Sequence, residues 1–281
     1  MLTIMKKIIV PVDFSNHSEF ALKAAAILAK KHNAEILALH MLEIGAVTMS
    51  ESAVHLQEMT VFHLKLAEKN FNNFLKKEYL KGIKVTPIIK HFKVFSEVNT
   101  IAQKNHADVI VMGSHGSSGF KEVFVGSNTE KVVRSATIPV LVVKNEQKNL
   151  NFDDVVFALD FSEKSVDAYK KAMKVLNALA KNIHLVHINT PFTDFMSSSE
   201  IEKKVVNFLE KAEGNISKLN TINYVADYTI EKGIFNFSNI VGGDLIAVIT
   251  HGRKGFAHYF SGSVSEDVTN HATLPVITFK M

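Results

Sequence analysis

Glycine and hydroxyl residues with a regular spacing follow an apolar segment in the first half of the chain. Gly113-Ser114-His115-Gly116 comes directly after Val109-Ile110-Val111-Met112, and Gly126-Ser127-Asn128-Thr129 follows after nine further residues. Glycine at the end of a strand lets the backbone approach a phosphate, and it permits turns that direct successive N–H groups inward. The second segment opens an amphipathic stretch, and the unpaired N–H groups at a helix start favour an anion. The Gly-x2-Gly-x9-Gly-Ser spacing therefore predicts a phosphate-binding loop, to which Ser127 and Thr129 add hydroxyl donors.

The elements that must position this loop belong to an internal repeat. The segment from Ile8 to Ser15, with the sequence IIVPVDFS, matches VVFALDFS from Val155 to Ser162, 147 residues later. Ser114-His115-Gly116 matches Thr250-His251-Gly252 at a smaller separation of 136 residues, so the second copy has lost 11 residues in its middle. We therefore expect two copies of one domain, at residues 1–146 and 152–281, with the polar stretch 145–151 as the linker.

Two kinds of apolar segment alternate within the first copy. Short segments with strand character alternate with longer ones of helical periodicity, which predicts an α/β domain built on a parallel, doubly wound sheet. Asn16, with Glu19 three residues on, is expected to cap the first helix. Such sheets bind ligands outside the carboxyl ends of their strands. The expected strands span about 7–13, 35–42, 83–90, 108–113 and 139–144, and the expected helices about 16–32, 52–80, 95–105 and 128–135.

Pro11-Val12-Asp13 at the end of the first strand and the glycine spacing at the end of the fourth together resemble the universal stress protein family. The likeness covers nearly the whole chain, twice, and in the first copy it is to the ATP-binding subclass. It implies two repeated five-stranded parallel sheets, Rossmann-like and adenine nucleotide alpha hydrolase-like, with strand order 3-2-1-4-5. It also implies that the two domains pair through their last strands, Val140 to Val143 and Val276 to Phe279, within one chain.

The same resemblance implies which residues hold a nucleotide. Pro11, Val12, Asp13 and Met41 would surround adenine and ribose. ATP, or ADP or AMP, is the implied ligand, and Mg²⁺ is expected to accompany a triphosphate, although the sequence names no protein ligand for it. The competing interpretation is that the glycines only form tight turns. The ribose and phosphate path would be lined by Met112, Gly113, His115, Gly116, Gly126, Ser127, Asn128 and Thr129.

The second copy departs from this pattern where the first is most regular. Ile249 stands in the place of Gly113, and Ala158 in the place of Pro11, although the later glycines remain. A branched side chain at this position is expected to close the phosphate approach. We therefore expect the second copy to have lost ATP binding, with adaptation to another anionic ligand as the alternative, because Arg253-Lys254 follows its loop.

The composition excludes several classes of protein. With 47% hydrophobic and 21% charged residues, the chain of 281 residues has the composition of a soluble globular protein. Its 32 Lys and Arg nearly balance 28 Asp and Glu and form no basic tail, which argues against specific nucleic-acid binding. The absence of cysteine excludes disulfides, thiolate catalysis and Cys-ligated zinc. No apolar run approaches the roughly 18 residues of a membrane helix, so we expect a cytoplasmic protein.

Other residue patterns invite functions that the sequence supports less well. His251, His258 and His271 cluster near the second loop, but their spacing matches no familiar zinc site. Asp13 and Asp160 at strand ends are more typical of hydrogen-bond acceptors than of catalytic bases, so no catalytic residue is assigned and at most slow ATP hydrolysis is expected.

The long helical segment from Ser52 to Lys81 carries a wide apolar face. We expect this face to pack in the core, with a partner-binding groove as the alternative. Its apolar residues are Leu56, Met59, Phe62, Leu66, Phe71, Phe74 and Leu75.

Two hypotheses of function follow. The first is an ATP-binding regulatory or sensor protein of a stress response, in which the N-terminal copy holds the nucleotide. The second is an interaction or scaffold protein with a dimer-like tandem body that binds no ATP. Gly113 and its loop favour the first hypothesis, and Ile249 shows that the chain tolerates the second in one half.

Overall fold

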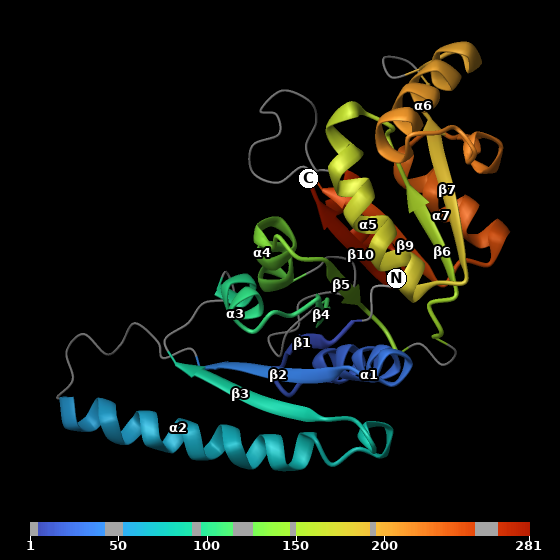
Figure 1. Cartoon of the computed structure of the whole chain (residues 1–281). Coiled ribbons are helices and arrows are strands. Elements are labelled where there is room, and N and C mark those ends of the chain that lie inside the picture. Colours follow the sequence, from blue (N-terminus) through green and yellow to red (C-terminus); the bar gives the residue numbers. More distant parts are fainter. Residues whose placement is uncertain are drawn as a thin grey trace. The chain divides into compact units, whose positions relative to one another are not determined.

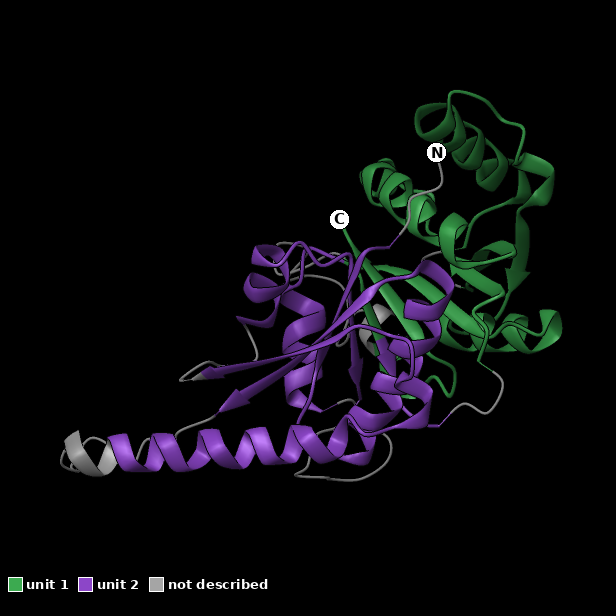
Figure 2. Ribbon diagram, turned by 60° about the horizontal axis from the view of Figure 1, so that its bottom comes forward, with its two compact units in different colours: residues 1–4, 139–141, 148–281 green, residues 5–138, 142–147 purple. Residues whose placement is uncertain are grey.

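The computed structural model describes residues 5–42, 53–91, 97–114, 126–146, 150–191, 195–250 and 264–281. The chain divides into two compact units, which Figure 2 colours purple and green. The N-terminal unit comprises residues 5–138 and 142–147, and the C-terminal unit contains residues 139–141 and 148–281. Apart from residues 139–141, the N-terminal unit holds the first copy of the repeat and the C-terminal unit holds the second; β5 is described below with the first copy.

The N-terminal unit is a five-stranded sheet with helices on both faces (Figure 1). Its elements are β1 (Lys7–Pro11), α1 (Asn16–His32), β2 (Glu35–Leu42), α2 (Ala53–Phe74), the 3₁₀ turn η2 (Glu78–Leu80), β3 (Val85–His91), α3 (Val98–Lys104), β4 (Val109–Gly113), α4 (Ser127–Ser135) and β5 (Val140–Val143). The strand order is β3-β2-β1-β4-β5, and β1 runs parallel to both β2 and β4. The expected α/β fold class and strand order are therefore confirmed for this unit.

The C-terminal unit repeats the same order. Its elements are β6 (Asp154–Ala158), the 3₁₀ turn η4 (Glu163–Ser165), α5 (Val166–Leu179), β7 (Asn182–Asn189), α6 (Ser198–Glu213), the 3₁₀ turn η6 (Leu219–Thr221), β8 (Asn223–Ala226), α7 (Ile230–Val241), β9 (Leu245–Thr250), α8 (Val264–His271) and β10 (Val276–Lys280). The strand order is β8-β7-β6-β9-β10, and β6 runs parallel to β7 and β9. β6 thus takes the place of β1, and the other strands follow.

A single aspartate holds the amino ends of the central strands together in each unit. Oδ2 of Asp108 accepts hydrogen bonds from the backbone N–H groups of Lys6 at 2.6 Å and Lys7 at 2.9 Å. Asp244 accepts the corresponding bonds from Asp153 at 2.9 Å and from the next residue at 3.1 Å. The two carboxylates accept from equivalent backbone groups, as expected of repeated domains. They lie at the amino ends of the strands, opposite the carboxyl ends that could bind a ligand.

The first helix begins as its sequence suggests, but with a different cap. The side chain of Ser15, not Asn16, accepts a hydrogen bond from the backbone N–H of Ser18, so Ser15 is the N-cap residue. The helix then buries its alanine-rich face and ends at His32, and the next residue, Asn33, caps it with a left-handed backbone (φ 53°). The expectation that Asn16 caps this helix is therefore wrong by one residue, because Asn16 already has helical geometry.

The second helix is shorter than expected and only partly buried. α2 ends at Phe74, and the chain turns before η2, in which Leu80 is buried. Within this turn the Nζ of Lys77 donates to a carboxylate oxygen of Glu19 in α1 at 2.9 Å. Ala67, Phe71 and Phe74 are buried, as expected of a core face. Leu75 is half-buried, and the side chain of Leu56 lies outside the described residues. The expectation of a core face is wrong for three of the apolar residues, because they are exposed: Met59, Phe62 and Leu66.

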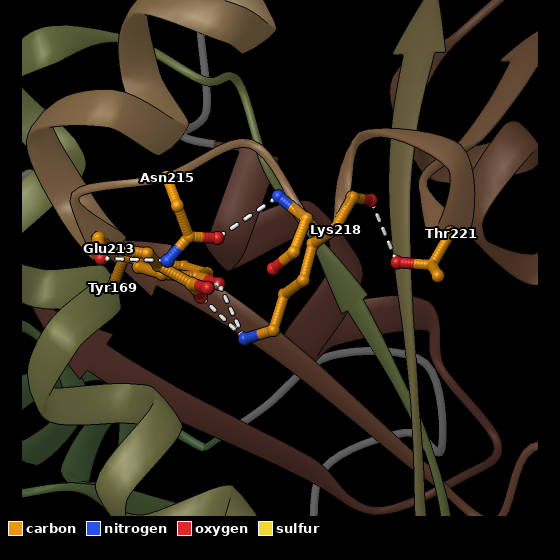
Figure 3. A network of polar contacts seen from close by, with 6 residues as sticks. Tyr169, Glu213, Asn215, Lys218 and Thr221 are labelled. Carbon is orange, nitrogen blue, oxygen red and sulfur yellow. Dashed lines mark hydrogen bonds and ion pairs between the residues drawn. The ribbon is translucent and has the colours of Figure 1, made fainter.

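A polar network in the C-terminal unit fastens the end of α6 to α5 (Figure 3). The hydroxyl of Tyr169 and the Nζ of Lys218 both donate to Oε1 of Glu213, and this lysine lies 3.4 Å from the tyrosine oxygen. Tyr169 is fully buried, and burial followed by the neighbouring carboxylate raises the pKa of its hydroxyl. Leu22 stands at the equivalent position of the first copy, so the network belongs to the second copy alone.

Candidate functional site

The carboxyl end of β1 begins the candidate site in the N-terminal unit. Val12 follows the strand, and its backbone N–H donates to the carbonyl of Leu39 in β2 at 2.7 Å. Because β1 and β2 are parallel and in register from Lys7 to Pro11, this places Asp13 beside the last residues of β2. Val12 and Met41 are both buried. Pro11, Val12 and Asp13 thus lie at the carboxyl end of β1, and Met41 lies near the carboxyl end of β2.

The turn after β1 is held by its own side chains. Oδ1 of Asp13 accepts hydrogen bonds from the Ser15 hydroxyl at 2.6 Å and from its backbone N–H at 3.1 Å. Phe14 lies between them and has a left-handed backbone with φ of 65°, a conformation that residues other than glycine rarely adopt. Its ring is fixed by α2, because it packs edge-on against Phe71 at 5.1 Å and Phe74 at 5.6 Å. These contacts hold the Asp13 carboxylate as a half-buried acceptor at the strand end.

His40 at the end of β2 is a positioning residue that motif reasoning did not assign. Its Nδ1 lies 2.7 Å from the carbonyl oxygen of Val12, and its ring packs on Phe14 with a centroid distance of 4.6 Å. A carbonyl oxygen only accepts, so Nδ1 carries the hydrogen in this contact. The second copy repeats the arrangement, since Nδ1 of His187 lies 3.2 Å from the carbonyl of Leu159. The match of His40 with His187 in the repeat was the signal that could have identified this role.

Gly113 ends β4, and its missing side chain faces the first helix. A Cβ at this position would lie 2.6 Å from the carbonyl oxygen of His17 and 2.7 Å from its carbonyl carbon. Contacts below 3.0 Å with backbone atoms are not tolerated, so only glycine lets the start of α1 pack this closely on β4. The structure therefore gives Gly113 a packing role that the sequence argument did not foresee.

The start of α4 is joined to the end of β4 by two hydrogen bonds. The backbone N–H of Gly126 donates to the carbonyl of Ser114 at 2.7 Å, and the Thr129 hydroxyl donates to the carbonyl of Gly113 at 2.8 Å. Ser114 and Thr129 are buried. The expected role of Thr129 as a hydroxyl donor to a ligand therefore does not fit this structure, because the hydroxyl hydrogen is already used inside the fold.

The first turn of α4 presents backbone N–H groups without a side-chain cap. Gly126 is the N-cap residue and has no side chain to accept from them. Ser127 is exposed and Asn128 is half-buried. Such a start, with the positive end of the helix dipole, is suited to an anion. Met112 is buried beneath the same edge, whereas His115 and Gly116 lie outside the described residues.

The equivalent region of the C-terminal unit differs at the start of its first helix. Phe161 repeats the left-handed backbone of Phe14, with φ of 50°, and Asp160 again accepts from the serine two residues later at 3.0 Å. The chain then forms the 3₁₀ turn η4, and the α-helix begins only at Val166. Ile249, at the end of β9, occupies the position of Gly113. Because a side chain there excludes the close packing seen at His17, we attribute the altered helix start to Ile249.

Electrostatics around the candidate sites come mainly from burial and backbone. Burial lowers the pKa of His187, so this imidazole stays neutral in the folded C-terminal unit at pH 7. In the part of the chain that the structure describes, no group of three His, Cys, Asp or Glu side chains is arranged to hold a metal ion. His251 and His258, which invited a metal site, lie outside the described residues.

Comparison with known proteins connects this geometry to a family. The sequence model of the Universal stress protein family matches the chain twice, at residues 5–144 and 151–280. The chain belongs to the universal stress protein family. It is a tandem member, because each match spans one of the two repeated domains.

Single-domain relatives match about half of this universal stress protein. Universal stress protein MJ0577 of Methanocaldococcus jannaschii is 32% identical over 160 residues, which is 52% of this chain and 99% of the relative. Universal stress protein YxiE of Bacillus subtilis is 32% identical over 145 residues, covering 49% of this chain and 98% of the relative. Over its whole length the chain is similar in fold to a universal stress protein from Archaeoglobus fulgidus. That crystal structure covers 100% of this chain and 98% of its own, with a TM-score of 0.67 and 22% identity, and it supports the fold alone.

Among the described residues, no helix combines the length and apolar character needed to cross a membrane.

Proposed function

We propose that the N-terminal domain binds an adenine nucleotide, ATP first and ADP or AMP as alternatives, and that the bound nucleotide regulates a cytoplasmic stress response. One observation carries this proposal: the glycine-capped start of α4 is joined to the carboxyl end of β4 through Gly126 and Ser114. Free N–H groups of a helix start beside the carboxyl ends of parallel strands suit a phosphate. The lack of cysteine suits a reducing compartment.

Each part of the strand edge would then have a separate task. Residues at the ends of β1 and β2, among them Val12 and Met41, would surround adenine and ribose, and the carboxylate of Asp13 would accept hydrogen bonds from ribose hydroxyls. The N–H groups of the first turn of α4 and the hydroxyl of Ser127 would meet the phosphates. The remaining proposed contacts are Pro11, Met112, Gly113, His115, Gly116, Gly126 and Asn128.

Mg²⁺ would enter this site with the triphosphate. The described residues offer no cluster of three acidic or imidazole ligands, so the nucleotide's own phosphates would hold the ion. Mg²⁺ is commonly bound through substrate phosphates and water with few protein ligands. The ion would neutralise phosphate charge that the backbone N–H groups alone leave uncompensated.

Catalysis is not part of the proposal. A general base must reach the proton that it removes, but the Asp13 carboxylate is held by two hydrogen bonds from Ser15. We therefore propose a sensor rather than an ATPase. For the C-terminal domain we propose loss of ATP binding, which the altered helix start beside Ile249 supports.

The second candidate function is an interaction protein that binds no ATP. The packing of Gly113 favours this candidate, because the contact with His17 explains the glycine without any phosphate. Under this reading the two domains form a scaffold, and the glycine spacing only builds turns. The two candidates differ in one measurable property, nucleotide binding by the N-terminal domain.

In both candidates we propose that the domains pair through their last strands. β5 and β10 each come last in the strand order of their own domain, and a domain by itself would leave one side of that strand without backbone partners. Pairing Val140–Val143 with Val276–Phe279 would cover both edges within one chain. The chain has no native cysteine, so one cysteine placed in each strand tests this directly. A disulfide within monomers supports the pairing, and a disulfide formed only between chains contradicts it.

Calorimetry with a charge at the helix start tests nucleotide binding. Ser127→Asp places a carboxylate in the first turn of α4, where it favours the helix but repels a phosphate. Ser198→Asp is the matched control, because Ser198 is the exposed first residue of α6. Two unit charges about 4 Å apart near a surface interact by about 4 kcal/mol, so we expect at least about tenfold weaker ATP binding in Ser127→Asp. Equal affinity in both variants, or no binding by the wild type, would favour the interaction protein.

A further inference from the structure

The helix α2 has two halves with opposite surroundings. Its carboxyl half is held in the N-terminal domain through Phe71 and Phe74, which pack on the Phe14 ring. Its amino half extends past the strands of its own domain (Figures 1 and 2). Met59 and Phe62 on this half are 40% and 60% exposed, and Leu66, just past the middle of the helix, is 42% exposed. Residues three and four apart lie on one face of a helix, so these three side chains form a continuous apolar stripe, called here the α2 stripe.

The repeat shows that the fold itself does not need the α2 stripe. α6 takes the place of α2 in the C-terminal domain, and it is 16 residues long where α2 has 22. All of α6 is described, and each of its large apolar side chains is buried or half-buried, for example Val205 and Phe208. The same fold is therefore built on a helix without an exposed stripe, and the stripe needs another explanation.

We propose that the α2 stripe is a dimerisation surface, on which the α2 helix of a second copy of this chain lies antiparallel. If Phe62 lies on the two-fold axis, Met59 faces Leu66 of the second copy, and the reverse contact follows by symmetry. Phe62 then meets the same residue of the second copy, a pair that aromatic rings favour in offset or edge-on geometry.

The charges beside the stripe select both the occupant and its direction. Glu58 and Lys65 are exposed, and each is next to one end of the stripe. In the antiparallel pair Glu58 faces Lys65 of the second copy, twice, because both lie on the same flank of the stripe; a parallel pair would not bring these two residues together. The exposed side of α2 also carries Glu68 and Lys69, so its charges are mixed. Helices that lie on membranes carry mainly Lys and Arg on the polar face, which argues against a lipid surface as the occupant.

The size of the stripe sets the strength of the expected pairing. Stable interfaces bury about 1,200–2,000 Å², and a single helix pair with three apolar residues from each copy falls below this range. The dimer is therefore expected to be weak and concentration-dependent, with a dissociation constant in the micromolar range or above. This association is separate from pairing through the last strands, which involves neither α2 nor its charges.

Sedimentation equilibrium over a wide concentration range tests the proposal. We expect the wild type to dimerise reversibly and Phe62→Glu to weaken the dimer by about tenfold or more, because it places two carboxylates on the axis. Ile240→Glu is the matched control: Ile240 is 81% exposed on α7, and its replacement is expected to leave the dimer unchanged. A wild type that stays monomeric throughout overturns the proposal, and so does a dimer that persists in folded Phe62→Glu.

Charge exchange tests the antiparallel direction. Glu58→Lys and Lys65→Glu each create like-charge contacts across the axis, so either variant alone is expected to dimerise less than the wild type. An equal mixture of the two is expected to regain association, because each mixed dimer pairs two lysines of one chain with two glutamates of the other. Circular dichroism confirms folding of each variant, as both positions are exposed. Mixtures that associate no better than the single variants contradict the proposed geometry.

Discussion

The first helix starts differently in the two halves of the molecule. In the N-terminal unit, α1 is regular from Asn16, and its first turn packs on Gly113 with backbone atoms that leave no room for a Cβ. In the C-terminal unit Ile249 takes the place of the glycine, and the chain makes the 3₁₀ turn η4 before α5 begins at Val166. Both turns before these helices keep a left-handed phenylalanine, Phe14 and Phe161.

This difference shows that a glycine in a ligand-binding motif can be required for the packing of a helix on a strand, and not only for contact with the ligand. Gly113 sets how closely α1 approaches β4, and the residues just before α1 form one wall of the candidate site. A side chain at this position therefore alters the site indirectly, by moving a helix start rather than by filling the space of a phosphate. The expectation that a branched residue here closes the phosphate approach stays a prediction, and the contact with His17 adds this indirect route to it.

The largest expected effect on stability comes from replacing Gly113 with valine, compared with the same replacement of Ile249 in the other unit. Gly113→Val forces a side chain against the backbone of His17, which we expect to cost about 3 kcal/mol of unfolding free energy. Ile249→Val only removes a methylene, so about 1 kcal/mol is expected at the equivalent position. Hydrogen exchange followed by mass spectrometry reads each unit separately. Unchanged protection of α1 in Gly113→Val would show that the glycine is not required for packing.

An intermediate effect is expected from a network that only the C-terminal unit has. Tyr169→Phe removes a hydrogen bond to the Glu213 carboxylate, which we expect to cost about 1–3 kcal/mol. Hydrogen exchange of peptides from α5 and α6 measures this loss. Peptides of the N-terminal unit serve as the control, because Leu22 stands at the equivalent position and makes no such bond.

The same tyrosine makes the stability of this unit depend on pH. Burial raises the folded-state pKa of Tyr169 above its ordinary value of about 10. The stabilisation of the folded state by the protonated Tyr169 hydroxyl is therefore fully present below pH 10, and it is lost as the pH rises through the folded-state pKa. We expect Tyr169→Phe to lose less stability than the wild type above pH 10. An identical alkaline slope in the two proteins would contradict this role.

The smallest expected effect is on the acid stability of the C-terminal unit and comes from His187. Burial lowers the pKa of His187 from its ordinary value of about 6.5, so the stability that it contributes is present above that pH and falls as the pH drops. We expect its imidazole NMR signals to titrate below pH 6.5, and His187→Asn to reduce the acid sensitivity of the C-terminal unit. Titration at or above pH 6.5 would be contrary to a buried, neutral ring.

The sequence was sufficient for those features that depend on periodicity and repetition. The matched segments around Asp13 and Asp160 identified the tandem architecture, and apolar patterning located the strands, for example 35–42, to within a few residues. The family's strand order is also observed in both units. These features are encoded locally along the chain, which is why they could be predicted.

Contacts between distant segments could not be predicted in the same way. The backbone of His17 opposite Gly113 and the inward hydroxyl of Thr129 both depend on how a helix docks on a strand. The exposure of Phe62 depends on how far α2 extends past its sheet, since periodicity shows an apolar face but not what covers it. Tyr169 gave no signal because its partner, Glu213, lies 44 residues away.

The stoichiometry of ATP binding by the full chain tests the central claim most directly. Calorimetry with Mg²⁺ on the wild type is expected to give one nucleotide per chain, because the regular start of α1 and the glycine-capped α4 occur together in the N-terminal domain. Ser127→Asp should then remove that single site. Two nucleotides per chain would contradict the proposed loss of binding in the C-terminal domain, and no binding at all would contradict the nucleotide sensor itself.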